Sequence, residues 1–98
     1  DAGMINRLSQ RFKLIEDRIN NAFAPSICQL QDDSEAHKGH AGAASGAGHY
    51  SVTIISEKFD GLNRISRHRL VYDAVGDLMH TEIHALVIKA LSPNEAQN

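Results

Sequence analysis

A long amphipathic stripe near the N-terminus is the feature that most restricts how this chain can fold. Large apolar residues recur there at spacings of three and four, which is the periodicity of a helix with one buried face. The stripe consists of Ile5, Leu8, Phe12, Ile15, Ile19 and Phe23. Pro25 ends the pattern, because the residue before a proline is disfavoured in the α-helical region. We therefore predict a helix from about Gly3 to Phe23 that must pack against an apolar layer.

Three segments have the patterns of β-strands and can supply that layer. Residues 26–31 fit a short strand, and residues 49–56 alternate apolar with small polar side chains at a period of two. Residues 83–91 are almost wholly apolar, as in a strand that is buried on both sides. A second helical region is predicted from about Asn63 to Met79, as a short helical turn followed by a longer helix.

This order of elements predicts an α/β (α+β) fold. The first two strands form a hairpin, and a right-handed helical crossover makes the second and third strands parallel. The result is a three-stranded mixed sheet with helices over one face. With 98 residues the chain has room for one core, so we expect a single domain over residues 1–98. We expect residues 1–3 to be a cloning remnant ahead of a natural start at Met4, and residues 94–98 to be a polar tail.

The composition excludes several classes of protein. No apolar run approaches the roughly 18 residues that span a bilayer, and no signal-peptide pattern is present, so we expect a soluble cytoplasmic protein without membrane contact. The single cysteine, Cys28, is predicted to be buried and unreactive. A net charge of −2 argues against nucleic acid as the main partner. No nucleophile elbow, phosphate-binding glycine loop or carboxylate pair beside a base occurs, so we do not expect an enzyme.

Histidine is unusually frequent, with six copies in the chain. Residues 32–48 have no apolar side chain larger than alanine, which predicts a long flexible loop, and this loop contains His37 and His40. Two loop histidines at this spacing are more often solvated than bound to a metal. His84 shares strand parity with Leu86, so its side chain is predicted to lean toward the helix-covered face. A histidine there is more often a hydrogen-bonded residue at the core edge than a ligand.

A cluster of potential cations lies at the start of the second helical region. Its members are Arg64, Arg67, His68 and Arg69. Such a stretch is usually a solvated helix face. It also has the charge and the donors to contact DNA phosphates or an acidic partner. Arginine near a helix N-terminus is mildly unfavourable against the helix dipole, which favours a role beyond local stability.

Two segments closely resemble the signature of the BolA family. They are FDGLNRISRHRLVY, from Phe59 to Tyr72, and IHALVIKALSP, from Ile83 to Pro93. The likeness continues upstream through the histidine-containing loop, so it covers nearly the whole chain from the first helix onward. The resemblance implies a class II KH-like fold of order α-β-β-α-(α)-β, which agrees with the order derived from the periodicities.

The resemblance implies partnership with a monothiol glutaredoxin. In such a complex a [2Fe–2S] cluster is held by a glutaredoxin cysteine, by glutathione and by the BolA-like chain, so no cluster is expected to stay tightly bound to the isolated chain. Carried over to this sequence, His84 of the His-Ala-Leu motif is the implied ligand. The second is His37 or His40, and His40 is favoured because its spacing to His49 resembles that of the family. Alone, the chain is expected to be a monomer or a weak dimer.

The resemblance also implies a different activity. Some bacterial members of the family are described as DNA-binding transcriptional regulators of morphology and stress response. In this chain Arg64, Arg67, His68 and Arg69, with the following helix, would then read DNA. An adaptor for iron–sulfur trafficking is the leading hypothesis, and the two activities do not exclude each other. A protein-interaction module that holds no cluster is the third alternative.

Overall fold

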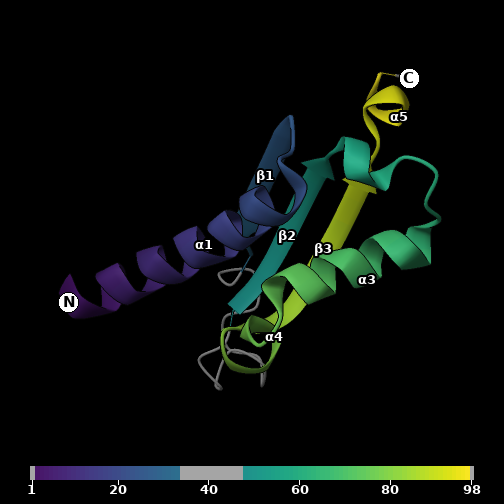
Figure 1. Ribbon diagram of the computed structural model, residues 1–98. Helices are drawn as coiled ribbons and strands as arrows, with labels where there is room; N and C mark the ends of the chain where they lie inside the picture. The colour runs from purple at the N-terminus through teal and green to yellow at the C-terminus, as the bar shows by residue number, and fades with distance from the viewer. Residues whose placement is uncertain (1, 34–47, 98) are drawn as a thin grey trace.

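The structure is a computed structural model that describes residues 2–33 and 48–97, and only the backbone of residues 2–9. Its elements are α1 (Ala2–Phe23), β1 (Ile27–Asp32), β2 (Gly48–Ile55), the 3-10 helix η2 (Glu57–Phe59), α3 (Arg64–Val75), α4 (Leu78–Thr81), β3 (Ile83–Leu91) and α5 (Pro93–Ala96) (Figure 1). This order confirms the predicted succession of helix, two strands, helix and strand. No helix within the described ranges is both long enough and apolar enough to span a membrane.

The three strands form one mixed sheet, and helices α1 and α3 pack against it (Figure 1). β1 pairs antiparallel with β2, and β2 pairs parallel with β3, so the predicted topology is confirmed. Parallel neighbours cannot be joined by a tight turn, and the segment containing α3 and α4 supplies the crossover. Because parallel strands run in the same direction, the first residues of β2 and β3 meet at one edge of the sheet.

The core lies between the helices and one face of the sheet. Alternate residues of β2 point into it, as a period of two requires. Its fully buried members include Ile15 and Ile19 of α1, Tyr50 and Ile54 of β2, Phe59 of η2, and Val71 and Val75 of α3. Cys28 packs against this core from β1. Burial, and secondly the Glu16 carboxylate, raises the pKa of the Cys28 thiol, which disfavours the reactive thiolate.

The second helical region is divided differently from the prediction. The longer helix, α3, comes first and the short helix, α4, follows. Gly76 separates them with a φ of 54°, in the left-handed region that glycine adopts most readily. The Gly76 N–H donates to the Tyr72 carbonyl at 2.8 Å and closes the last turn of α3. At the other end, the Asn63 side chain accepts a hydrogen bond from the Ser66 N–H and caps α3.

Both ends of the loop predicted over residues 32–48 belong to strands instead. Asp32 is the last residue of β1, because it pairs with Tyr50. Gly48 is the first residue of β2, because it pairs with Ile83 of β3. The two histidines of the predicted loop, His37 and His40, lie outside the described residues.

The expected polar tail contains a short helix, α5. Ser92 and Glu95 form a capping box there, in which each side chain accepts a hydrogen bond from the other residue's backbone N–H. This arrangement satisfies two donors that a helix start would otherwise leave without partners. Pro93, whose ring fixes φ at a helical value, occupies the first turn.

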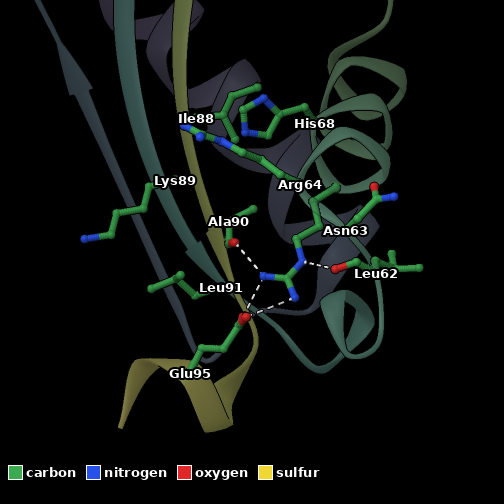
Figure 2. Close-up of a pocket in the computed structure, with 10 residues that line it drawn as sticks. Leu62, Asn63, Arg64, His68, Ile88, Lys89, Ala90, Leu91 and Glu95 are labelled. Carbon is green, nitrogen blue, oxygen red and sulfur yellow. Dashed lines mark hydrogen bonds and ion pairs between the residues drawn. The ribbon is translucent and has the colours of Figure 1, made fainter. Parts of the chain in front are cut away.

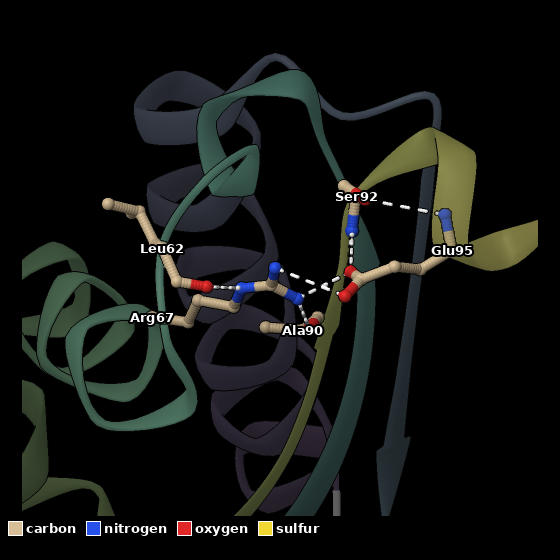
Figure 3. Close-up of polar contacts among 5 residues, drawn as sticks. All are labelled: Leu62, Arg67, Ala90, Ser92 and Glu95. Carbon is tan, nitrogen blue, oxygen red and sulfur yellow. Dashed lines mark hydrogen bonds and ion pairs between the residues drawn. The ribbon is translucent and has the colours of Figure 1, made fainter.

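The first turns of α3 and the strand β3 border a groove of about 470 Å³ (Figure 2). Arg67, which also lines the groove, connects α3 to β3 and α5 (Figure 3). The Arg67 side chain is only 11% exposed, and its Nε and Nη1 donate to the carbonyls of Leu62 at 2.9 Å and Ala90 at 3.0 Å. Its Nη1 and Nη2 also contact the two carboxylate oxygens of Glu95 at 2.6 and 3.3 Å. Arg67 therefore satisfies a carbonyl of the edge strand β3 and fixes α5 through a two-pronged ion pair.

We predict that Ile19→Ala lowers the free energy of unfolding by about 2–5 kcal/mol. Ile19 is 0% exposed, so the truncation removes buried methyl groups and leaves a cavity. Urea denaturation followed by circular dichroism measures the change. Ile65→Ala is the matched control, because Ile65 is 65% exposed and its truncation is expected to stay within about 0.5 kcal/mol. Equal losses in the two variants would contradict the described core.

A second prediction concerns stability in acid. The hydrogen bonds from Arg67, and then those from Ser92, lower the pKa of Glu95 from 4.5 to about 2. A carboxyl whose pKa is lower in the folded state stabilises the fold above its unfolded pKa, and this contribution is lost as the pH falls through the folded value. Glu95→Gln should therefore weaken the dependence of the melting temperature on pH between about 4.5 and about 2.

Glu57→Gln is the control for that experiment, because Glu57 is exposed and has no ion pair among the described residues. Its melting temperature should follow the wild-type dependence on pH. An unchanged acid profile for Glu95→Gln would show that the Arg67–Glu95 pair does not stabilise the fold.

Candidate functional site

The beginnings of β2 and β3 bring two histidines together. Gly48 pairs with Ile83 and His49 pairs with Ala85, so β3 has one extra residue, His84, between the two pairs. The rings of His49 and His84 have centroids 4.8 Å apart and planes inclined at 48°. His84 is exposed, whereas His49 is half-buried. The exposed imidazole of His84 is therefore accessible to a partner.

His84 does not face the side of the sheet that strand parity predicts. Regular alternation from the buried Leu86 would place His84 on the helix-covered face. The buried residue there is instead Ile83, which is 2% exposed. The extra residue is a β-bulge, which interrupts the alternation of side chains. His84 contacts His49, which precedes the buried Tyr50 and so lies on the opposite face. The prediction of a core-edge His84 is therefore wrong.

Backbone hydrogen bonds tie this edge to all three strands. The Gly48 N–H donates to the Glu82 carbonyl at 3.0 Å, immediately before β3. The N–H of Asp33, which follows β1, donates to the His49 carbonyl at 2.7 Å. The Ser51 hydroxyl donates to the Asp33 carboxylate. The histidine pair thus lies on a hydrogen-bonded framework, which fixes where an incoming ligand would meet it.

Two imidazoles provide two nitrogen donors, fewer than a complete coordination set. Among the side chains of residues 10–33 and 48–97, no group of three or more His, Cys, Asp or Glu could hold a metal ion. Further ligands would have to come from a partner, from a small molecule or from other parts of the chain. His37 and His40 belong to those other parts, so their role as second ligand stays a prediction.

His49 is the residue of this site that the sequence analysis does not select. The alternation of residues 49–56 marks it only as the start of a strand. The signal was nevertheless present, because two strands predicted to be parallel begin at the same edge of the sheet. His49 and His84 each lie near the start of such a strand, and the ring contact follows from that placement.

The four basic residues predicted near the start of α3 do not form one surface. Arg67 is held by the contacts described above. Arg64 and His68 border the groove beside β3, and Figure 2 shows both side chains pointing toward the strand. Arg69 is exposed and does not line this groove. Within the described chain, neither Arg64 nor Arg69 has an ion-pair partner, so both charges remain accessible to an anionic ligand.

Comparison with known proteins gives one consistent family. The family model described as BolA-like protein matches residues 19–95. The chain is 34% identical over 84 residues to the DNA-binding transcriptional regulator BolA of Vibrio cholerae, which covers 86% of this chain and 76% of that protein. It is 32% identical over 99 residues to the chloroplastic protein BOLA1 of Arabidopsis thaliana, covering 98% of this chain and 60% of that protein. It spans only 25% of SufE-like protein 1 of Arabidopsis thaliana, at 33% identity over 90% of this chain.

Solved structures agree with this assignment. The BolA domain of SufE1 from Arabidopsis thaliana is similar at a TM-score of 0.76 and 31% identity, over 87% of this chain and 94% of that one. BolA1 from the same plant is similar at a TM-score of 0.74 and 32% identity, over 86% of this chain and 93% of that one. The shared architecture is the α+β fold with a three-stranded mixed sheet. Because the family model matches most of the chain and the fold agrees, this protein belongs to the BolA-like family.

Proposed function

We propose that this chain is an adaptor that partners a monothiol glutaredoxin and contributes His84 to a shared [2Fe–2S] cluster. The observation that carries the proposal is the exposed His84 ring, which lies beside His49 on the face of the sheet away from the helices. Neutral imidazole is a good ligand for iron, and an exposed position lets a cluster held by another protein approach.

Among the described side chains the two imidazoles are an incomplete donor set, which favours a shared cluster over a resident metal. A cluster bridging two proteins takes some ligands from each, so His84 and one further imidazole would be enough on this side. His40, His37 and His49 are the candidates for the second imidazole, and His49 is the one whose ring lies next to His84. Two imidazoles on one iron would resemble Rieske ligation, which raises the reduction potential above that of an all-cysteine cluster.

The test is to mix the chain with cluster-loaded monothiol glutaredoxin and record visible absorption and circular dichroism. His84→Ala is expected to abolish the spectral change that mixing produces, because the ligand nitrogen is lost. His80→Ala is the matched control, since His80 is also exposed but lies in α4, and it should behave as wild type. His49→Ala and His40→Ala then identify the second imidazole. A full spectral change with His84→Ala would refute this ligand assignment.

A DNA-binding regulator is the second candidate function. Two relatives, from Vibrio cholerae and Escherichia coli, are named DNA-binding transcriptional regulators. The exposed Arg64 and Arg69 could contact phosphates, whereas Arg67 would first have to leave Glu95 and the Ala90 carbonyl. The net charge of −2 opposes strong binding except through a local basic patch.

Binding to duplex DNA over a salt series tests this candidate. If Arg64 and Arg69 each contact a phosphate, Arg64→Ala and Arg69→Ala should each reduce the salt slope by about 1 and weaken binding to all sequences alike. Lys13→Ala is the control, because Lys13 is an exposed side chain of α1, and it should change neither quantity. Binding without any preference for DNA sequence near physiological salt would contradict a role as a specific regulator.

A further inference from the structure

Arg11 of α1 joins the two strand beginnings that carry the histidine pair. Its Nε donates to the Tyr50 hydroxyl at 2.8 Å, and its Nη1 lies 3.8 Å from the Glu82 carboxylate. Tyr50 follows His49 directly in β2, and Glu82 precedes His84 by two residues. The Arg11 side chain is only 10% exposed, so its contact to the buried Tyr50 is shielded from water, whereas Glu82 is 40% exposed.

Tyr50 offers Arg11 a fixed and neutral anchor. Its side chain is 1% exposed, and the Arg11 guanidinium also lies 5.8 Å from the centre of its ring. Burial raises the pKa of Tyr50, while the Arg11 charge opposes that rise in part. The hydroxyl is therefore protonated at physiological pH and can accept the hydrogen bond without burying a second charge.

Gly48 leaves the space that the Tyr50 ring requires. A Cβ at Gly48 would lie 2.6 Å from Cε2 and 3.0 Å from Cζ of Tyr50, well inside normal carbon–carbon contact. The Gly48 N–H meanwhile donates to the carbonyl of Glu82, the residue whose carboxylate faces Arg11. Any side chain at Gly48 would push the Tyr50 ring, and with it the hydroxyl, away from the position where Arg11 binds it.

We propose that Arg11, acting through Tyr50 and Glu82, is a positioning residue for the two histidines. It holds the beginning of β2 against the beginning of β3 in the register that makes His84 the extra residue of the bulge. A slip of one residue would turn strand side chains to the opposite face and separate the His84 ring from His49. The importance of this positioning for cluster binding rests on the proposed function. The arrangement of the two rings can be measured in the chain alone.

Two variants of the full chain test the inference. Tyr50→Phe removes only the hydroxyl, and Arg11→Met removes the guanidinium but keeps a long apolar stem. In the wild type, nuclear Overhauser effects (NOEs) should connect the imidazole protons of His49 and His84, because the ring centroids are 4.8 Å apart. Both variants should lose these NOEs, and Arg11→Lys should restore them in part, because it keeps the charge facing Glu82.

Arg18→Met is the matched control on the same helix. Arg18 contacts the Val75 carbonyl at 3.3 Å and the Asp77 carboxylate at 3.6 Å, at the junction of α3 and α4. Removing its guanidinium breaks one hydrogen bond and one ion pair at that junction without touching the beginning of β2. The NOEs between the two histidine rings should persist in this variant.

The outcomes separate this inference from the proposed function. Retention of the NOEs in both Tyr50→Phe and Arg11→Met overturns the positioning role, even where His84→Ala abolishes the cluster spectrum. Loss of the NOEs supports the positioning role, even where His84→Ala leaves the spectrum of the glutaredoxin mixture unchanged. If Arg11→Met does not fold, Tyr50→Phe and Gly48→Ala decide by the same measurement, and both should lose the NOEs between the two histidine rings.

Discussion

Parallel pairing between β2 and β3 places the first residues of both strands at one edge of the sheet, although a whole helical crossover separates them in sequence. The crossover helix α3 must return over the sheet, and its buried Val71 and Val75 meet the apolar stripe of α1 there. The same packing that forms the core therefore also brings His49 beside His84. A hairpin between these strands would have placed the two residues at opposite ends of the ladder.

The bulge at the beginning of β3 decides what the histidine pair can do. With uninterrupted alternation, His84 would share the face of Leu86 and point toward the helices, where burial would hide its nitrogens from a partner. One extra residue places it on the face away from the helices instead. The hydrogen bond from Gly48 to Glu82 lies just before the bulge, and Arg11 contacts one residue before it, Glu82, and one after it, Tyr50.

The spacing of apolar residues was sufficient to predict α1 and the three strands, and the helical crossover then predicted the parallel pairing of β2 with β3. It could not predict the bulge, since the alternation of residues 83–91 is masked by a nearly continuous apolar run. Gly76 and the spacing of Ser92 and Glu95 are local sequence signals of a helix end and a helix start, so both boundaries can be predicted from the sequence. The role of Arg67 cannot be predicted in this way, because only tertiary folding brings the Ala90 carbonyl close to it.

The position of Arg67 changes how the basic stretch at the start of α3 should be interpreted. An arginine near a helix N-terminus is disfavoured by the helix dipole, and this is compensated here by Glu95 and by two backbone carbonyls rather than by an external anion. The charges left accessible, Arg64 and Arg69, belong to the helical layer, whereas His84 lies on the face of the sheet away from the helices. Contacts to DNA through these arginines and contacts to a cluster through His84 would therefore use different surfaces of the chain.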